Sequence, residues 1–324
     1  MPLARVVTFA HEIYTVETTG GEELTTELSG RLRYSGDLWP AVGDWVEVRG
    51  GIAIDEVVAR KNTISRKDPG TRNEEQILAA NVDVAFVVSG LDGDFNIRRI
   101  ERYLVLAEES RVRPVLVLNK ADLIPDRTSI VEILRPVAKD IPVEFVSACM
   151  RDVQGLCSHV QRGETAVLLG SSGVGKSTIV NALLGCPLQK TNAVREADSR
   201  GRHTTTQRHL LTIPGGWFLI DTPGLREVQL WADAASVDSA FDEIAELAEA
   251  CHFTNCSHSS EPGCAVIDAV ENGSLDRSRL DSFYKLRREA AFLDRKQDPR
   301  AMSEYQRNIK QIMRSVRHHP KYKR

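Results

Sequence analysis

The sequence predicts a multidomain α/β protein with an N-terminal β-barrel, a central domain built on a parallel sheet, and a C-terminal helical domain that binds a metal. Three observations predict this fold. Short alternating apolar runs fill residues 1–70, longer apolar runs alternate with helical stretches over 77–229, and three cysteines gather beside a histidine within 230–324. We take these three ranges as the domain boundaries.

Length and charge limit the class of protein. A chain of 324 residues can form two or three domains, and its net charge of −3 argues against a nucleic-acid partner for the chain as a whole. From Tyr284 onward, however, there are thirteen Lys or Arg and four Asp or Glu. This basic end suits contact with a polyanion, and it also fits a solvated tail. No apolar run approaches the roughly 20 residues of a membrane helix, so we expect a cytoplasmic protein without a membrane partner.

The first 70 residues are predicted to form an OB-type barrel. Five runs read as antiparallel strands, namely RVVTFA, EIYTVETT, GRLRYS, DWVEVR and IAIDEVVA. OB-type barrels often bind oligonucleotides on one open side, where Arg31, Arg33, Tyr34 and Trp45 would supply charge and stacking. Trp45 fits the barrel core equally well. The polar stretch SRKDPGTRNEEQ, Ser65 to Gln76, is predicted to be a linker.

A phosphate-binding loop follows an apolar strand of the central domain. In LLGSSGVGKST the pattern Gly-x-x-x-x-Gly-Lys-Ser stands where a strand ends and a helix begins. Its backbone amides and the helix N-terminus would hold phosphate oxygens, Lys176 would reach the β- and γ-phosphates, and Ser177 would bind Mg²⁺. The nucleotide contacts expected here are Gly170, Ser171, Ser172, Gly173, Val174, Gly175, Lys176, Ser177 and Thr178.

Two further segments are expected around the phosphates. In WFLIDTPGL, Asp221 would hold Mg²⁺ through water, and the Gly224 amide would contact the γ-phosphate. The polar segment NAVREADSRGRHTTTQRH would supply a threonine to Mg²⁺. We choose Thr205 among Thr204, Thr205 and Thr206, and either neighbouring threonine is an alternative magnesium ligand.

A base-recognition motif precedes the phosphate loop. In VLVLNKADLI, Asp122 would accept hydrogen bonds from guanine, Asn119 would contact its other edge, and the stem of Lys120 would lie over the ring. Ser147 and Ala148, in VSA at the end of the next strand, complete the base site and offer a backbone amide to the guanine oxygen. These motifs favour GTP over ATP and oppose the alternative of an ATPase. Because base recognition comes before phosphate binding, the reverse of the ordinary GTPase order, the sequence predicts a circularly permuted GTPase domain.

The cysteine cluster predicts one structural zinc ion. CHFTNCSHSSEPGC places Cys251, Cys256, His258 and Cys264 in one short stretch, a soft donor set that suits tetrahedral Zn²⁺. His252 is a competing ligand, and its spacing to Cys256 favours His258. Four protein ligands leave no open position, so a structural site is favoured over a catalytic one.

Taken with the permuted order, FNIRRIERYL, GRHTTT and EPGCAV resemble the ribosome small subunit-dependent GTPase A family (RsgA/YjeQ). The resemblance implies an OB domain, a permuted GTPase domain and a zinc domain. It also implies binding to the small ribosomal subunit and its rRNA during late maturation, with GTP hydrolysis stimulated by that particle. Other small-subunit maturation factors are candidate partners, and we expect a monomer.

One residue position bears on catalysis. Leu225 stands after Gly224, where many GTPases carry a Gln that positions water, and an apolar side chain cannot orient water. The resemblance points to His203 in GRHTTT as a substitute, although a histidine in a basic loop is otherwise simply solvated. Lys176 and Thr205 complete the predicted catalytic set.

Two alternatives concern the function as a whole. The barrel, the zinc module and the basic end would also suit a nucleic-acid-binding scaffold in which GTP only orders the chain and turnover is negligible. The terminal stretch SEYQRNIKQIMRSVR has one apolar and one basic side, which fits a membrane surface. We prefer a helix packed on its own zinc domain with the basic side toward RNA.

Overall fold

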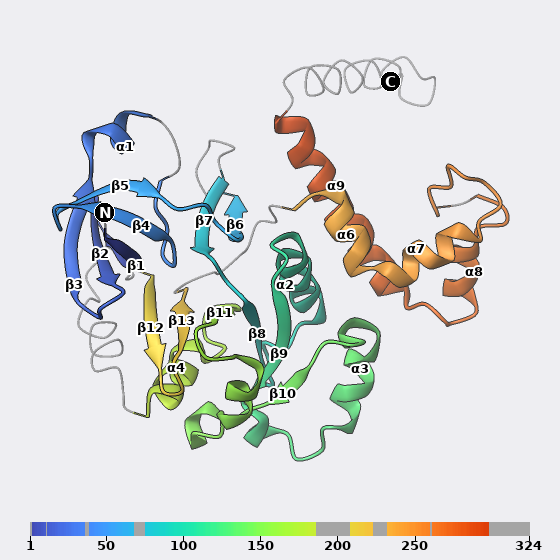
Figure 1. The fold of residues 1–324 in the computed structure, drawn as a ribbon. Helices are drawn as coiled ribbons and strands as arrows, with labels where there is room; N and C mark the ends of the chain where they lie inside the picture. Colours follow the sequence, from blue (N-terminus) through green and yellow to red (C-terminus); the bar gives the residue numbers. More distant parts are fainter. Residues whose placement is uncertain are drawn as a thin grey trace, which may run out of the picture. The chain divides into compact units, whose positions relative to one another are not determined.

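The computed structural model describes residues 2–10, 12–35, 39–67, 75–185, 208–222, 232–259 and 261–297 (Figure 1). The chain divides into two compact units, residues 1–66 with 76–228 and residues 67–75 with 229–324. The first unit contains both the predicted barrel and the predicted nucleotide domain. No helix among the described residues is both long enough and apolar enough to cross a lipid bilayer.

The N-terminal residues form a closed five-stranded barrel. Its elements are β1 (Leu3–Ala10), β2 (Ile13–Thr18), β3 (Glu23–Leu28), α1 (Gly30–Ser35), β4 (Trp45–Arg49) and β5 (Ala53–Val57). The strands pair in the order β1-β2-β3-β5-β4, and β4 pairs with β1 to close the barrel. Alternate side chains fill its interior, including Val6, Tyr14, Val16, Val46 and Ile54. The predicted barrel is confirmed.

Three details of the sequence prediction for this region are corrected. GRLRYS is the helix α1 and not a strand, because only Leu32 is buried and the Ser29 hydroxyl accepts the Leu32 amide at 3.3 Å as a helix cap. The barrel strand that replaces GRLRYS is β3, which was not predicted because its sequence ELTTEL is largely polar. β3 pairs in parallel with β5. The predicted linker is partly strand, because β6 (Thr63–Lys67) pairs with β7 (Glu75–Ala80), while residues 68–74 lie outside the described ranges.

The central part of the sheet consists of six described strands in the order β10-β9-β8-β11-β13-β12, parallel except for β12. β12 also pairs antiparallel with β1 of the barrel, so the two parts form one continuous sheet. The strands are β8 (Val84–Gly90), β9 (Arg113–Asn119), β10 (Val143–Phe145), β11 (Thr165–Leu169), β12 (His209–Ile213) and β13 (Trp217–Asp221). The α-helices among its described residues are α2 (Ile97–Glu109), α3 (Thr128–Ala138) and α4 (Lys176–Leu184). All seven residues of β8 are buried, as expected for an inner parallel strand.

The two faces of this sheet carry separate apolar cores. Ala85 and Val87 of β8 belong to the core that includes α2 and α3, whereas Val84, Phe86 and Val88 belong to the core that includes α4. This alternation follows from the two-residue period of a strand. Because β11 lies between β8 and β13, the segment after Leu169 emerges at the middle of the sheet.

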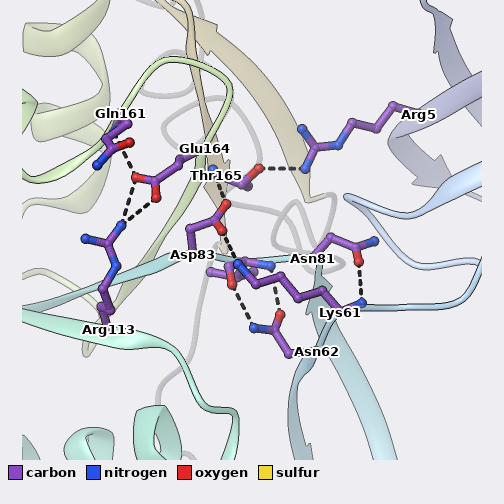
Figure 2. A network of polar contacts seen from close by, with 10 residues as sticks. Arg5, Lys61, Asn62, Asn81, Asp83, Arg113, Gln161, Glu164 and Thr165 are labelled. Atoms are coloured by element: carbon purple, nitrogen blue, oxygen red, sulfur yellow. Dashed lines mark hydrogen bonds and ion pairs between the residues drawn. The ribbon is translucent and has the colours of Figure 1, made fainter.

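A polar network joins the barrel to the start of β11 (Figure 2). The Arg5 guanidinium donates to the Thr165 hydroxyl at 2.6 Å, and the Thr165 amide donates to Asp83 at 2.8 Å. Arg5 also lies over the rings of Phe218 and Trp45, at 4.7 and 5.5 Å from their centroids. Burial lowers the pKa of Arg5 to about 10, so the side chain remains charged at neutral pH. Trp45 therefore packs on Arg5, where the barrel meets β11.

The described residues of the second unit after residue 231 form helices and the loops between them. The unit contains α6 (Ala234–Ala240), α7 (Asp242–Glu249), α8 (Ala265–Glu271) and α9 (Arg277–Gln297). Arg279 of α9 is buried, donates to Glu243 at 2.7 Å and to the Ala240 carbonyl at 3.0 Å, and lies 3.9 Å from the centre of the Phe241 ring. Phe241 in turn packs on Phe283. This small core joins α6, α7 and α9 without any strand among its described residues.

We predict that Arg60→Ala will destabilise the barrel by about 3–5 kcal/mol, because it leaves the fully buried Asp44 carboxylate without its countercharge. Arg60 donates to both Asp44 oxygens, at 2.8 and 2.6 Å, and to the Trp39 carbonyl at 2.7 Å. Urea unfolding followed by tryptophan fluorescence measures the loss.

Arg31→Ala is the matched control for this prediction. Arg31 forms an exposed pair with Glu56 at 3.5 Å, and such pairs contribute about 1 kcal/mol or less. Equal unfolding midpoints for the two variants would contradict the stabilising role of the buried pair.

Candidate functional site

The phosphate-binding loop connects the buried strand β11 to α4. Lys176, the first residue of α4, is buried, and its ammonium donates to the carbonyls of Gly170 and Ser171 at 2.7 Å each. Val174 is buried in the core beneath the loop. The loop thus curls around its own lysine at the N-terminus of a helix, where backbone amides favour an anion.

Two glycines allow the close contacts of this loop. Gly175 has a φ of +96°, and a Cβ there would lie 2.2 Å from the Asn119 side-chain nitrogen. A Cβ on Gly170 would lie 2.5 Å from the Val88 carbonyl oxygen. Both positions therefore exclude larger residues, because real Cβ contacts essentially never come so close.

The predicted base motif lies directly beside the phosphate loop. Asn119 ends β9, and its buried side chain donates to the Val174 carbonyl at 2.8 Å and accepts the Ala148 amide at 3.1 Å. Lys120, in the left-handed region with a φ of +65°, donates to the Gly173 carbonyl at 3.1 Å. The structure therefore brings together two segments that are 55 residues apart in the chain.

The carboxylate expected to bind guanine is exposed and charged. The Ser147 hydroxyl donates to Asp122 at 2.5 Å, and this hydrogen bond lowers the pKa of Asp122. The Cys149 thiol is exposed and lies 3.7 Å from the same carboxylate oxygen. An ionised carboxylate accepts hydrogen bonds and donates none, so it suits the N1–H and amino group of guanine.

The residues expected around Mg²⁺ are only partly described. Asp221 ends β13 next to β11, and Ser177 lies in the first turn of α4, beside the phosphate loop. The neighbouring Thr222 was missed by the sequence analysis; its buried hydroxyl donates to the Leu168 carbonyl at 2.6 Å and fixes the chain where it leaves the sheet. His203, Thr205, Gly224 and Leu225 lie outside the described residues.

Three more side chains near the nucleotide site were missed from the sequence. Asp92 pairs with Lys120, while Asp94 accepts the Ser171 hydroxyl at 2.6 Å and Arg99 donates to Ser171 at 2.8 Å. Their signal in the sequence is an Asp-rich turn that directly follows a buried parallel strand, at the sheet edge where ligands bind. Arg99 lies in the adjoining stretch FNIRRIERYL, Phe95 to Leu104.

The four predicted zinc ligands lie together in the second unit. The ligand atoms of Cys251, Cys256, His258 and Cys264 are all within 4.8 Å of one another. The Nδ1 atom of His258 lies 3.5 Å from the sulfurs of both Cys251 and Cys264, and those two sulfurs are 3.9 Å apart. Tetrahedral Zn²⁺ with bonds of 2.3 Å to sulfur requires sulfurs about 3.8 Å apart, so the cluster fits the ion.

The surroundings of the cluster hold its histidine in place. The Tyr284 hydroxyl donates to the His258 carbonyl at 2.6 Å, and burial lowers the pKa of His258, which keeps the imidazole neutral as metal binding requires. His252, the competing candidate, packs edge-on against Phe253 with ring centroids 4.6 Å apart and is not one of the four grouped residues.

The residues expected to bind RNA on the barrel are spread over α1 and β4. Tyr34 is 88% exposed, whereas Trp45 is partly buried against Arg5. Arg31 and Arg33 are exposed on α1 and form loose ion pairs with Glu56 and Glu12 at 3.5 and 3.4 Å. Among the aromatic candidates, Tyr34 therefore offers the freely accessible ring.

Comparison with known proteins agrees with this geometry. The family model described as RsgA GTPase matches residues 57–231. A protein of Opitutus terrae named small ribosomal subunit biogenesis GTPase RsgA is 44% identical over 311 residues, covering 90% of this chain and 85% of the relative.

Two solved structures have a similar fold. The structure of YjeQ from Thermotoga maritima has a TM-score of 0.66 and 28% identity, and covers 90% of this chain and 98% of that one. YloQ, titled a circularly permuted GTPase, has a TM-score of 0.62 and 23% identity over 90% of this chain and 95% of its own. The predicted fold class, including the permuted nucleotide domain, is confirmed.

A second family model, described as ABC transporter, matches residues 153–322. This range shares the phosphate loop and then covers α6 to α9, where the described residues form helices and no strand. It leaves out the base motif at Asn119, which contacts the phosphate loop. The RsgA GTPase model includes both the base motif and the phosphate loop, which Asn119 joins, and the Opitutus relative aligns with 90% of this chain. The chain therefore belongs to the RsgA GTPase family.

Proposed function

We propose that this chain is a GTPase that binds the small ribosomal subunit and its rRNA during late maturation and hydrolyses GTP faster on that particle. The observation that carries the proposal is the joining of Asn119, Val174 and Ala148, which places the base motif against the phosphate loop. A relative that aligns with 90% of the chain is named as a biogenesis GTPase of that subunit. Other small-subunit maturation factors are candidate partners, and the protein acts in the cytoplasm as a monomer.

The nucleotide is proposed to bind with its base at Asp122 and its phosphates at the loop. Asp122 accepts the N1–H and amino group of guanine, and the stem of Lys120 covers the ring. The Ala148 amide, which donates to the Asn119 oxygen at 3.1 Å, is shared with the guanine oxygen. The residues proposed to contact the phosphates are Gly170, Ser171, Ser172, Gly173, Val174, Gly175, Lys176, Ser177, Thr178 and Gly224. Exposure of Asp122 in the described structure supports this assignment, since the base can reach it.

As a GTPase of this family, the chain uses GTP with Mg²⁺ and carries a structural zinc ion. Ser177, Thr205 and Asp221 are the proposed magnesium ligands. Bound Mg²⁺ neutralises phosphate charge as it develops during phosphoryl transfer. Lys176 adds a second positive charge from the protein. Its ammonium donates to two carbonyls of the loop that is proposed to bind the phosphates, which supports this role.

The attacking water needs a polar group that Leu225 cannot provide. His203 is proposed to orient this water when it lies over the nucleotide. A bound particle that held His203 at this position would then raise turnover. The proposed rRNA contacts are Tyr34, Arg31 and Arg33, which are exposed on the barrel, and the basic C-terminal end of the chain.

The scaffold alternative is not favoured. The family model that matches this chain and the relatives are named as GTPases.

Purified small ribosomal subunits are expected to raise GTP turnover well above the rate of the isolated protein. Large subunits and duplex DNA are the controls and should not raise it. Binding should weaken as salt rises, because contacts with rRNA phosphates release counterions. Released phosphate measured across a titration of subunits checks this.

Two variants sharpen the same experiment. His203→Ala should keep its GTP affinity and lose most of the stimulated rate, and removal of residues after Ala301 should weaken subunit binding more than GTP binding. Equal stimulation by any polyanion, or none by small subunits, would refute the proposed partner.

Asp122→Asn should weaken GTP binding by about 1.5–3 kcal/mol and shift preference toward xanthine nucleotides, because the amide places a donor where guanine also has donors. Isothermal titration with GTP and XTP measures both effects. Asp126→Asn is the matched control, since its amide oxygen can still accept the Thr128 amide now bound at 2.9 Å. Unchanged GTP affinity in Asp122→Asn would remove this residue from the base site.

Cys264→Ser is expected to release zinc and to unfold the stretch from Cys251 to Cys264, because a structural metal contributes its binding energy to folding. GTP affinity should survive, because the nucleotide residues lie in the other unit. Metal analysis and circular dichroism provide the readouts, with Cys157→Ser as a control outside the cluster. Wild-type protein without stoichiometric zinc would contradict the structural site.

A further inference from the structure

The loop Leu91–Asn96 lies between the buried strand β8 and α2 and is fixed at both ends. Within it, the Phe95 amide donates to the Asp92 carbonyl at 3.0 Å, and the Asp94 amide donates to the Asp92 carboxylate at 3.2 Å. Asn96 caps α2 by accepting the Arg99 amide at 3.2 Å, and Phe95 packs on the core. These contacts give the loop one shape, so its two carboxylates have defined directions.

The first carboxylate holds the lysine of the base motif. Asp92 forms an ion pair with Lys120, and the same ammonium donates to the Gly173 carbonyl at 3.1 Å. A Cβ on Gly90 would lie 2.8 Å from an Asp92 oxygen, so the glycine leaves room for this approach. The hydrogen bond from Lys120 lowers the pKa of Asp92, which keeps the pair charged at neutral pH.

The second carboxylate holds the phosphate loop through a triangle of contacts. Asp94 accepts the Ser171 hydroxyl at 2.6 Å and Arg99 at 2.7 Å, while Arg99 also donates to the Ser171 oxygen at 2.8 Å. Burial raises the pKa of Asp94, but the hydrogen bonds from Arg99 and Ser171 outweigh it and lower the pKa overall. An ionised Asp94 can only accept, so the direction of the serine hydroxyl is fixed.

Asp94 and Arg99 act on Lys176 through the backbone of Ser171. The carbonyl of Ser171 accepts Lys176 at 2.7 Å, while its hydroxyl is held by Asp94 and Arg99. A shift of Ser171 would therefore move one of the two carbonyls that orient the lysine. Fixing these groups before the nucleotide arrives lowers the entropy lost on binding.

We propose that the loop Leu91–Asn96 positions both lysines of the nucleotide site, Lys120 directly through Asp92 and Lys176 through Asp94 and Ser171. This inference rests on the proposed GTPase function and adds Asp92, Asp94, Arg99 and the Ser171 side chain as positioning residues. The two carboxylates act on different parts of the ligand. Asp92 supports contacts that every guanine nucleotide makes, whereas Asp94 supports contacts that only the β- and γ-phosphates make.

The test measures how affinity depends on the number of phosphates. Competition against a fluorescent GDP analogue gives dissociation constants for GMP, GDP and GTP. Asp92→Asn should weaken all three by a similar factor, about fivefold. Asp94→Asn and Ser171→Ala should weaken GDP and GTP by about fivefold to tenfold and leave GMP unchanged.

Matched controls separate positioning from general damage. Ser171→Thr keeps the hydroxyl and should restore most of the GDP affinity lost in Ser171→Ala. Asp140→Asn makes the same chemical change at an exposed residue and should bind all three nucleotides normally. Wild-type affinities in the Asp94 and Ser171 variants, or equal losses for all three nucleotides with a lowered melting temperature, would overturn the proposal.

A different result would indicate failure of the underlying function. If the wild-type chain bound ATP as tightly as GTP, the guanine site itself would be wrong. If the wild type prefers GTP and the variants lose nothing, only the positioning role of the loop fails.

Discussion

The side chain of Asn119 joins three loops that the chain order keeps apart. Its nitrogen donates to the phosphate loop at Val174, and its oxygen accepts the amide of Ala148 in the second base loop. Asn119 is buried, so loss of either contact would leave a polar atom unsatisfied in the interior. In a permuted chain the base motif no longer follows the phosphate loop along the sequence. The nucleotide site therefore depends on hydrogen bonds of this kind between loops.

The same permutation explains how the flanking modules connect to the site. The barrel contacts the start of β11 through Arg5 and Thr165, and β11 continues directly into the phosphate loop at Gly170. At the other end, β13 carries Asp221 and is the last strand of the described chain before the zinc-binding helices. The barrel thus contacts the strand that leads to the phosphate loop, and the C-terminal module follows in sequence the strand that ends at Asp221, a predicted magnesium ligand. A particle that held the barrel and the C-terminal module would act on strands that lead into the site.

The order of the nucleotide motifs and the grouping of the cysteines could be predicted from sequence, because few alternatives satisfy such constraints. A glycine at Gly175 is required by its conformation and by the closeness of Asn119, and three thiolates near one imidazole suit few ligands other than zinc. The helix α1 could not be distinguished from a strand, since GRLRYS buries only Leu32 and a single apolar residue defines no period. The contacts of Asp94 and Arg99 with Ser171 span more than seventy residues and depend on side-chain directions that no local pattern encodes.

The most direct test of a single guanine site is the rate at which the Cys149 thiol is alkylated, because this exposed thiol lies 3.7 Å from Asp122. Cys157 is an internal reference, since burial raises the pKa of its thiol and slows its reaction. Peptide-resolved mass spectrometry should show that GDP slows alkylation of Cys149 and that ATP at the same concentration does not. Unchanged alkylation in protein that has bound GDP, or equal protection by ATP, would contradict the account.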